Sequence, residues 1–240
     1  TCTANITNNL SNRNLIINGA MQIWQRGTSS TTSGMYTVDR WTCNFDGGAV
    51  TQSQGTETSG TVFQKGFRNY LRVTNTSNIT GTDKYRFIQT ALEAQDIANS
   101  GWSYNSTSSY LTLSFWVRSS LAGTYYGFLK ASDGTEYYYP FSTGAISADT
   151  WTKITKKIPG NSNLTFNNDS GEGLSVHIAP WYGTDFTDNS ITLDAWATMN
   201  SGGRGKDYTE AWANTSNATF DLTGVQLEVD STGSGVATDF

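Results

Sequence analysis

Short segments in which apolar and polar residues alternate recur along most of the chain. Alternation with period two is the signature of a β-strand with one buried face, because successive side chains point to opposite sides. The clearest example is residues 111–120, where one face carries Leu111, Leu113, Phe115 and Val117 and the other carries Thr112, Ser114, Trp116 and Arg118. Other strand-like segments lie at residues 15–17, 35–45, 50–54, 70–75, 85–92, 151–158, 174–183 and 217–229.

Turn signals separate these segments. Asp133-Gly134, between two aromatic-rich runs, predicts a β-hairpin over residues 123–143, and Asn18-Gly19 predicts an earlier turn. Residues 27–34 are expected to form a loop, and residues 92–100 are the only good helical candidate. The pattern therefore predicts an all-β fold of two packed antiparallel sheets with little helix. Residues 1–13 are polar and aperiodic and are expected to be a lead-in segment, with a single domain over residues 14–240.

Composition narrows the range of partners. Charged residues make up 15% of the chain and hydrophobic residues 36%, both low for a cytosolic enzyme, whereas aromatic residues reach 13%. The net charge of −5 and the lack of a basic run argue against nucleic acid. No stretch of about 18 apolar residues occurs, so membrane insertion is not expected. Cys2 and Cys43 are expected to be free thiols, with Cys43 in the core, and a disulfide between them is the alternative.

Candidate catalytic chemistry is sparse. His177 is the only histidine and lies on an apolar strand, where a structural role is expected, and no nucleophile–His–acid set is evident. Paired carboxylates for glycoside cleavage stay open, because Asp and Glu number 20. A loose calcium loop is conceivable at Asp185, Asp188 and Asp194, although turn residues that cap local amides are the simpler interpretation. No other cofactor is expected.

Four segments together resemble a known family. They are NLIINGAMQIWQRGTS (14–29), YTVDRW (36–41), LTLSFWVRSS with the Tyr-rich hairpin and Trp151, and FDLTGVQLEV…ATDF (220–240). In order and spacing they resemble the carbohydrate-binding-module-like C-terminal domain of bacteriophage tail fibres and related virion appendages. The resemblance implies a jelly-roll β-sandwich on the virion surface, outside the cell. It also implies a homotrimer that contacts other virion proteins, and recognition of host-surface polysaccharide or glycan without catalysis.

A more distant likeness concerns calcium. Secreted jelly-roll sugar-binding modules hold a structural calcium between an N-terminal Asn-Gly turn and a C-terminal strand. Residues 18–22 and 222–225 stand at these places, but Gln22, Thr223 and Gly224 replace the acidic ligands. Because Ca²⁺ usually takes carboxylates among its oxygen ligands, only backbone carbonyls remain for such a site here.

Sugar recognition needs aromatic rings that stack on a pyranose and polar groups that bind its hydroxyls. Trp24, Trp41 and Trp151 lie beside apolar neighbours and are expected in the core or at sheet ends. Trp181 and Tyr182 are neighbours in a strand and point to opposite faces, so one of the two rings is expected to be at least partly exposed. Trp102 and Tyr104 lie in a polar loop, where exposure is also expected. The candidate sugar-binding residues are Trp181, Tyr182, Trp102, Tyr104, Trp116, Arg118 and Trp212.

Two other functions compete with sugar binding. The outward aromatic residues would serve subunit contacts if the domain were purely structural or an oligomerisation module of a virion protein. A polysaccharide depolymerase is a weaker alternative, because it would need a pair of carboxylates that the sequence does not single out.

Overall fold

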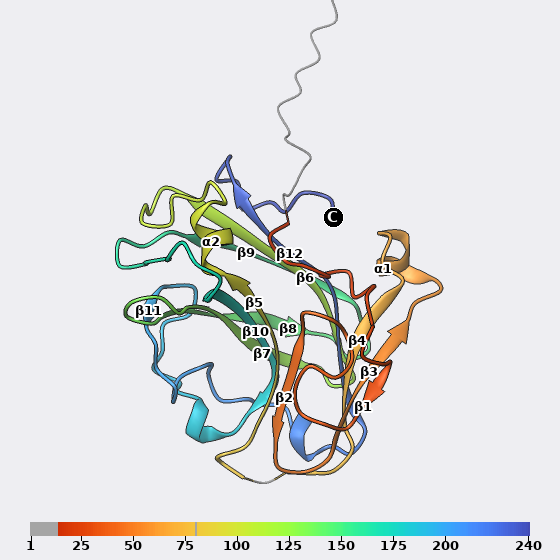
Figure 1. Ribbon diagram of the computed structural model, residues 1–240. Helices are drawn as coiled ribbons and strands as arrows, with labels where there is room; N and C mark the ends of the chain where they lie inside the picture. Colours follow the sequence, from red (N-terminus) through yellow and green to blue (C-terminus); the bar gives the residue numbers. More distant parts are fainter. Residues whose placement is uncertain (1–13, 80) are drawn as a thin grey trace, which may run out of the picture.

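The computed structural model describes residues 14–79 and 81–240, and within them twelve strands form two antiparallel sheets (Figure 1). Sheet A contains, in spatial order, β1 (Ser29–Ser30), β3 (Val50–Thr56), β4 (Asn69–Asn75), β12 (Ala218–Asp230), β6 (Tyr110–Ser119) and β9 (Thr152–Pro159). Sheet B contains β11 (Ala197–Thr198), β8 (Tyr137–Ile146), β7 (Gly123–Ala131), β10 (Glu172–Tyr182), β5 (Tyr85–Glu93) and β2 (Thr42–Asp46).

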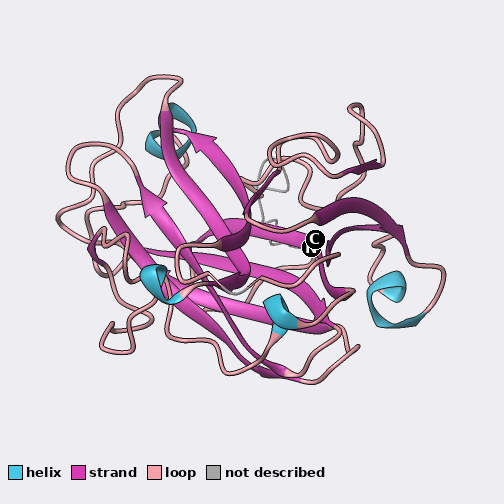
Figure 2. Ribbon diagram, turned by 90° about the horizontal axis from the view of Figure 1, so that it is seen from below, coloured by secondary structure: helices cyan, strands magenta, loops and turns pink. Residues whose placement is uncertain are grey.

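The two sheets pack face to face, and the chain crosses between them repeatedly. It passes from β4 in sheet A to β5 in sheet B, back to β6, on to β7 and β8, and back again to β9. Figure 2 shows the strands stacked in layers, with short helical segments at the periphery. These segments are α1 (Gly60–Gln64), α2 (Ala94–Ala98), η1 (Thr184–Phe186) and η2 (Trp212–Asn214). The predicted all-β jelly-roll sandwich is confirmed.

The core lies between the sheets and uses the faces that the alternation predicted. Leu111, Leu113, Phe115 and Val117 of β6 are fully buried, and Phe115 meets Phe141 of the opposite sheet with ring centroids 6.1 Å apart. Burial of such side chains is the main term that offsets the conformational entropy lost on folding. Cys43 is a free, buried cysteine of this core, and burial raises the pKa of its thiol to about 12. Cys2 lies outside the described residues, as does the expected lead-in segment 1–13.

The Asn18-Gly19 turn joins the start of the domain to its last strand. Asn18 has a φ of 56°, and the Val225 amide donates a hydrogen bond to the Gly19 carbonyl over 3.0 Å. A Cβ at Gly19 would lie 1.9 Å from the Val225 carbonyl oxygen, so this contact requires glycine. The two ends of the domain therefore meet, as the resemblance implied.

Several predicted boundaries were wrong. Residues 15–17 and 35–41 do not form strands, because their buried residues, among them Val38 and Trp41, reach the core from turns. The predicted loop at residues 27–34 contains the short strand β1, and the predicted helix at residues 92–100 shrinks to α2. α1 and β11 were not predicted, because two to five residues carry no readable period.

Membrane spans were sought among the helices of the described residues, and none of these helices has the length and apolar character that crossing requires.

Candidate functional site

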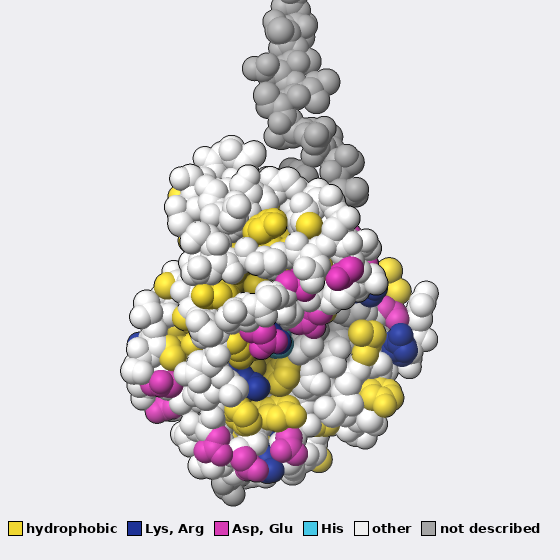
Figure 3. All heavy atoms as spheres, turned by 60° about the vertical axis from the view of Figure 1, so that its left-hand side comes forward, with side chains coloured by type: hydrophobic (Ala, Val, Ile, Leu, Met, Phe, Trp, Pro, Cys, Tyr) yellow, Lys and Arg dark blue, Asp and Glu magenta, His cyan; other side chains and the backbone are white. Residues whose placement is uncertain are grey.

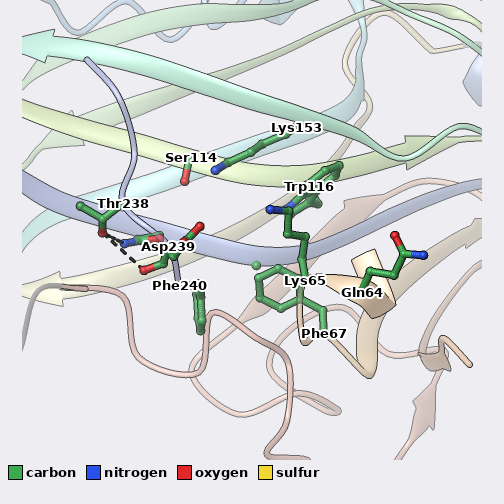
Figure 4. A pocket seen from close by; sticks show the side chains of 11 residues that line it. Gln64, Lys65, Phe67, Ser114, Trp116, Lys153, Thr238, Asp239 and Phe240 are labelled. Carbon is green, nitrogen blue, oxygen red and sulfur yellow. Dashed lines mark hydrogen bonds between the residues drawn. The ribbon is translucent and has the colours of Figure 1, made fainter. Parts of the chain in front are cut away.

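The outer face of sheet A carries a pocket of about 290 Å³. Pockets that bind small ligands have volumes from about 300 Å³ upward, so this pocket is close to the lower end of that range. We call it the Trp116 pocket. Trp116 lies on β6 between two register partners, Lys153 of β9 and Thr223 of β12. Because its neighbours Phe115 and Val117 point into the core, strand alternation turns the Trp116 ring outward. Figure 4 shows the ring among the other lining side chains, which are Gln64, Lys65, Phe67, Ser114, Lys153, Gln226, Thr238, Asp239 and Phe240.

A β-bulge shapes the floor of the pocket. The register of β12 against β6 shifts between Thr223 and Gln226, and Gly224 within this bulge has a φ of 60°. A Cβ on Gly224 would lie 2.6 Å from the Phe67 ring, so the ring packs directly on the glycine backbone. The bulge therefore places one aromatic wall of the pocket.

The chain end forms the opposite wall. The Thr238 amide donates to Glu228 Oε1 over 2.7 Å, and its hydroxyl donates to Glu228 Oε2 over the same distance. Gln226 Nε2 donates to the Thr238 hydroxyl over 3.0 Å. Phe240 then meets Phe67 edge-on, with ring centroids 5.1 Å apart. Hydrogen bonds to a buried carboxylate thus hold residues 238–240 against the sheet.

The residues beside the pocket form an ion-pair network. Asp221, whose side chain is 1% exposed, accepts hydrogen bonds from Arg72 Nε over 2.7 Å and from Arg118 Nε over 2.8 Å. The hydrogen bond to Asp221 raises the pKa of Arg72. Arg118 also pairs with Glu57 over 2.9 Å and lies 4.5 Å from the centre of the Trp151 ring. These contacts give the Arg118 guanidinium a structural role in the network, and its contact with a sugar stays a prediction.

The other predicted sugar-binding residues lie away from the Trp116 pocket. Trp102 is 3% exposed and packs edge-on to the half-buried Tyr104, and Trp212 is fully buried with its indole N–H donating to the Thr219 carbonyl. These two tryptophans cannot stack on a ligand at the surface, which corrects the expectation. Trp212 is buried because Asn75 Nδ2 donates to the carbonyls of residues 212, 213 and 215, which fixes η2 against β4.

The Trp181-Tyr182 pair alternates as predicted, and one ring of the pair, that of Trp181, is partly exposed. Trp181 packs, partly buried, against the main core, and Tyr182 faces the outside of sheet B. There Tyr182 is only 2% exposed, because Phe186 and Arg204 of the following loop cover its ring. The sequence could not show this cover, since it comes from a loop with no regular pattern.

The outer face of sheet B gathers hydrophobic side chains between charged ones (Figure 3). Phe128, Tyr138 and Tyr182 belong to a buried cluster on this face, and partly buried side chains such as Phe186 and Tyr208 pack against it. A second pocket, of about 240 Å³, opens beside β2 and β5, and its lining includes Arg40, Gln89, Glu93 and Glu172 but no aromatic ring among the described residues. It lacks the flat apolar surface on which a pyranose stacks.

His177 on the same face does not form a catalytic set. Its Nε2 lies 3.0 Å from the Ser175 hydroxyl, and that hydroxyl donates to Glu172 Oε1 over 2.9 Å. The carboxylate thus contacts the serine and does not orient the imidazole, unlike in a catalytic triad. Burial, with smaller contributions from Arg204 and Lys130, lowers the pKa of His177 to about 3. The structural role expected for this residue agrees with these contacts.

The predicted calcium loop is not gathered into a site. No group of three His, Cys, Asp or Glu side chains that could hold a metal ion occurs within residues 14–79 and 81–240. Asp188 Oδ1 accepts a hydrogen bond from the Ser190 amide, and Asp194 pairs with Lys156 over 3.0 Å. Asp185 lies within the 3₁₀ turn η1, which has no side-chain cap. Of the three residues, Asp188 has the local capping role that was the simpler interpretation.

Most of the pocket was not predicted. Trp116 followed from alternation, but Phe67, Lys65 and residues 238–240 lie in segments without a period. One signal was readable: Gly224 within an otherwise regular strand pattern indicates a bulge or a close approach of another group.

No protein-family model matches the chain, and no curated protein matches it. Among solved structures, the chain is similar to the enzymatically active domain of tailspike protein 4 of bacteriophage CBA120, with a TM-score of 0.47 and 10% identity over 91% of this chain and 22% of that chain. It is also similar to the CBM22-2 xylan-binding domain of Paenibacillus barcinonensis Xyn10C, with a TM-score of 0.42 and 14% identity over 84% of this chain and 98% of that one. A third similar structure is a family 11 carbohydrate-binding module of Clostridium thermocellum in complex with a tetrasaccharide, with a TM-score of 0.37 and 15% identity over 84% and 95%. At these values the similarities carry no argument about what this chain binds.

Proposed function

We propose that the chain is a non-catalytic carbohydrate-binding domain of a phage virion appendage and that a host-surface saccharide binds in the Trp116 pocket. The observation that carries this proposal is the pairing of an outward, half-buried Trp116 ring with hydrogen-bonding side chains in one open pocket. The ring offers a flat apolar face, and Gln64, Ser114 and Gln226 offer donors and acceptors for hydroxyl groups. The virion context rests on the sequence resemblance, as does the expected homotrimer.

Cleavage in this pocket is disfavoured by its carboxylates. Glycoside hydrolysis generally takes two carboxyl groups that flank the scissile bond. Asp239 is the single carboxylate among the described residues that line the pocket, and Glu228 beside it is bonded to Thr238 through both oxygens. A depolymerase reaction would therefore lack its second group here.

The experiment is saccharide binding by the assembled domain, measured on a glycan array and by calorimetry with a host-surface polysaccharide. Trp116→Ala is expected to weaken binding by about 2 kcal/mol, roughly 30-fold in Kd, as for other central tryptophans of binding sites. Tyr36→Ala is the control, because Tyr36 is a 49% exposed ring that does not line the pocket. Equal effects of the two substitutions would contradict the assignment of the pocket, and absence of binding by the wild type would contradict the function.

A structural or oligomerisation role is the second candidate, and exposed apolar side chains favour it. Ile17 and Ile23 are 49% and 47% exposed, and both lie in the turn region near the start of the domain. Apolar side chains of this size are often buried on association. Ile23→Asp is expected to dissociate such an oligomer while sparing saccharide binding, and sedimentation analysis would show it; an unchanged mass would remove Ile23 from any interface.

A further inference from the structure

Two lysines end at the Trp116 pocket from opposite sides. Lys65 follows α1 at one wall, and Lys153 reaches in from β9, where it is the register partner of Trp116. Figure 4 shows both side chains directed toward the space beside the Trp116 ring. Two cationic groups thus lie next to the half-buried Trp116 ring.

Neither lysine forms an ion pair with a carboxylate of residues 14–79 or 81–240. The ion pairs of the described residues join Arg26, Arg72, Lys84, Arg118, Lys130 and Lys156 to carboxylates, and neither Lys65 nor Lys153 is among them. Other cationic side chains of the described residues, among them Arg68 and Lys157, also lack an ion pair, so what sets these two lysines apart is their place at the pocket. Asp239 is the one side-chain carboxylate among the described residues that line the pocket, against two lysine side chains.

We infer that the pocket takes an acidic saccharide, with the sugar ring on Trp116 and its carboxylate between Lys65 and Lys153. This inference rests on the proposed function and specifies its ligand class. The polar groups Gln64, Ser114 and Gln226 would serve a neutral sugar equally well, whereas two ammonium groups beside the ring favour a negatively charged one. Ammonium–carboxylate hydrogen bonds are stronger than neutral ones.

The test uses paired polysaccharides that differ only in charge. Polygalacturonate, alginate and hyaluronan are each compared with the carboxyl-reduced, neutral form of the same polymer in affinity electrophoresis and calorimetry of the full chain. Binding of at least one acidic polymer, with tenfold or greater loss on reduction of its carboxylates, is the expected result. Added salt is expected to weaken this binding, because screening acts on partly exposed charges.

Two failures are distinguishable. Equal binding of acidic and reduced forms, or binding of neutral glycans only, overturns the inference and leaves the proposed function standing. No binding to any acidic or neutral saccharide overturns both. Sulfated or phosphorylated glycans that bind better than the carboxylated ones would also overturn the assignment of a sugar carboxylate.

Charge-removing variants locate the contact. Lys65→Gln and Lys153→Gln are each expected to weaken binding of the acidic polymer about fivefold, the upper end for an exposed ion pair. Both side chains are exposed, so thermal stability should not change. Lys157→Gln is the matched control: it lies on the same strand and face as Lys153, but its ammonium is 3.9 Å from the Tyr110 ring and outside the pocket. Asp239→Asn is expected to tighten binding of the acidic polymer. Equal losses of affinity in all three lysine variants would overturn the inference.

Discussion

Lowering the pH from 7 to 5 is expected to destabilise this protein through one residue, His177. Its ring is 8% exposed, lies 4.2 Å from the Phe128 ring in a parallel stack, and has Ser175 as its hydrogen-bond partner. Burial, then the charges of Arg204 and Lys130, lower its pKa from 6.5 to about 3 in the folded protein. The unfolded chain therefore binds a proton below pH 6.5 that the folded chain does not bind until about pH 3.

The direction and size of the effect follow from this difference. Where the unfolded state binds more protons, stability rises with pH, so this contribution is present above pH 6.5 and is lost progressively as the pH falls toward 3. With a reference pKa of 6.5, protonation of the unfolded chain costs about 2 kcal/mol of stability between pH 7 and pH 5. Carboxylates also titrate at the acid end of this range, so the comparison needs a variant without the imidazole.

Urea unfolding at pH 7 and pH 5 measures the effect in the wild type and in His177→Phe. The phenylalanine keeps a ring on Phe128, and the variant is expected to lose about 2 kcal/mol less than the wild type over this interval. Because the chain has a single histidine, its imidazole signal in an NMR titration reports on His177 alone. A midpoint near pH 6.5 in the folded protein, or identical pH dependence of the variant, would refute the reasoning from burial.

Three further predictions concern the side chains that shape the sandwich and the Trp116 pocket. Asp221→Ala leaves two arginines without their shared carboxylate and is expected to lower the free energy of unfolding in urea by about 2–4 kcal/mol. The control Asp194→Ala removes an exposed ion pair and is expected to lower it by under about 0.5 kcal/mol. Equal losses of stability in the two variants would contradict the ion-pair network. Trp212→Ala is expected to cost about 3–5 kcal/mol in the same assay, and a stable variant with lost saccharide binding would restore it as a ligand contact. Gly224→Ala is expected to lower the free energy of unfolding by about 1–2 kcal/mol, because Gly224 has a positive φ. It is also expected to weaken saccharide binding, because the new methyl group would displace the Phe67 ring. An unchanged Kd in calorimetry would rule out the packing of Phe67 on Gly224.

The sequence by itself determined the local geometry of this protein. Period-two alternation in residues 111–120 assigned each side chain of β6 to a face, because the pleat of a strand allows no other arrangement. The Asp133-Gly134 turn was readable for a similar reason, since Gly134 adopts a φ of 66° that other residues disfavour. The outward direction of Trp116 followed from the same alternation.

Only the tertiary structure decided which outward rings meet solvent. Trp116 and Tyr182 both point away from the core, but the loop after β10 covers Tyr182, whereas α1 and the chain end flank Trp116 without closing over it. Lys65, Trp116 and Thr238 come from three distant parts of the chain, and no local period connects them. Burial of a side chain depends on which distant segment packs above it, and that choice is made by the packing of the whole domain.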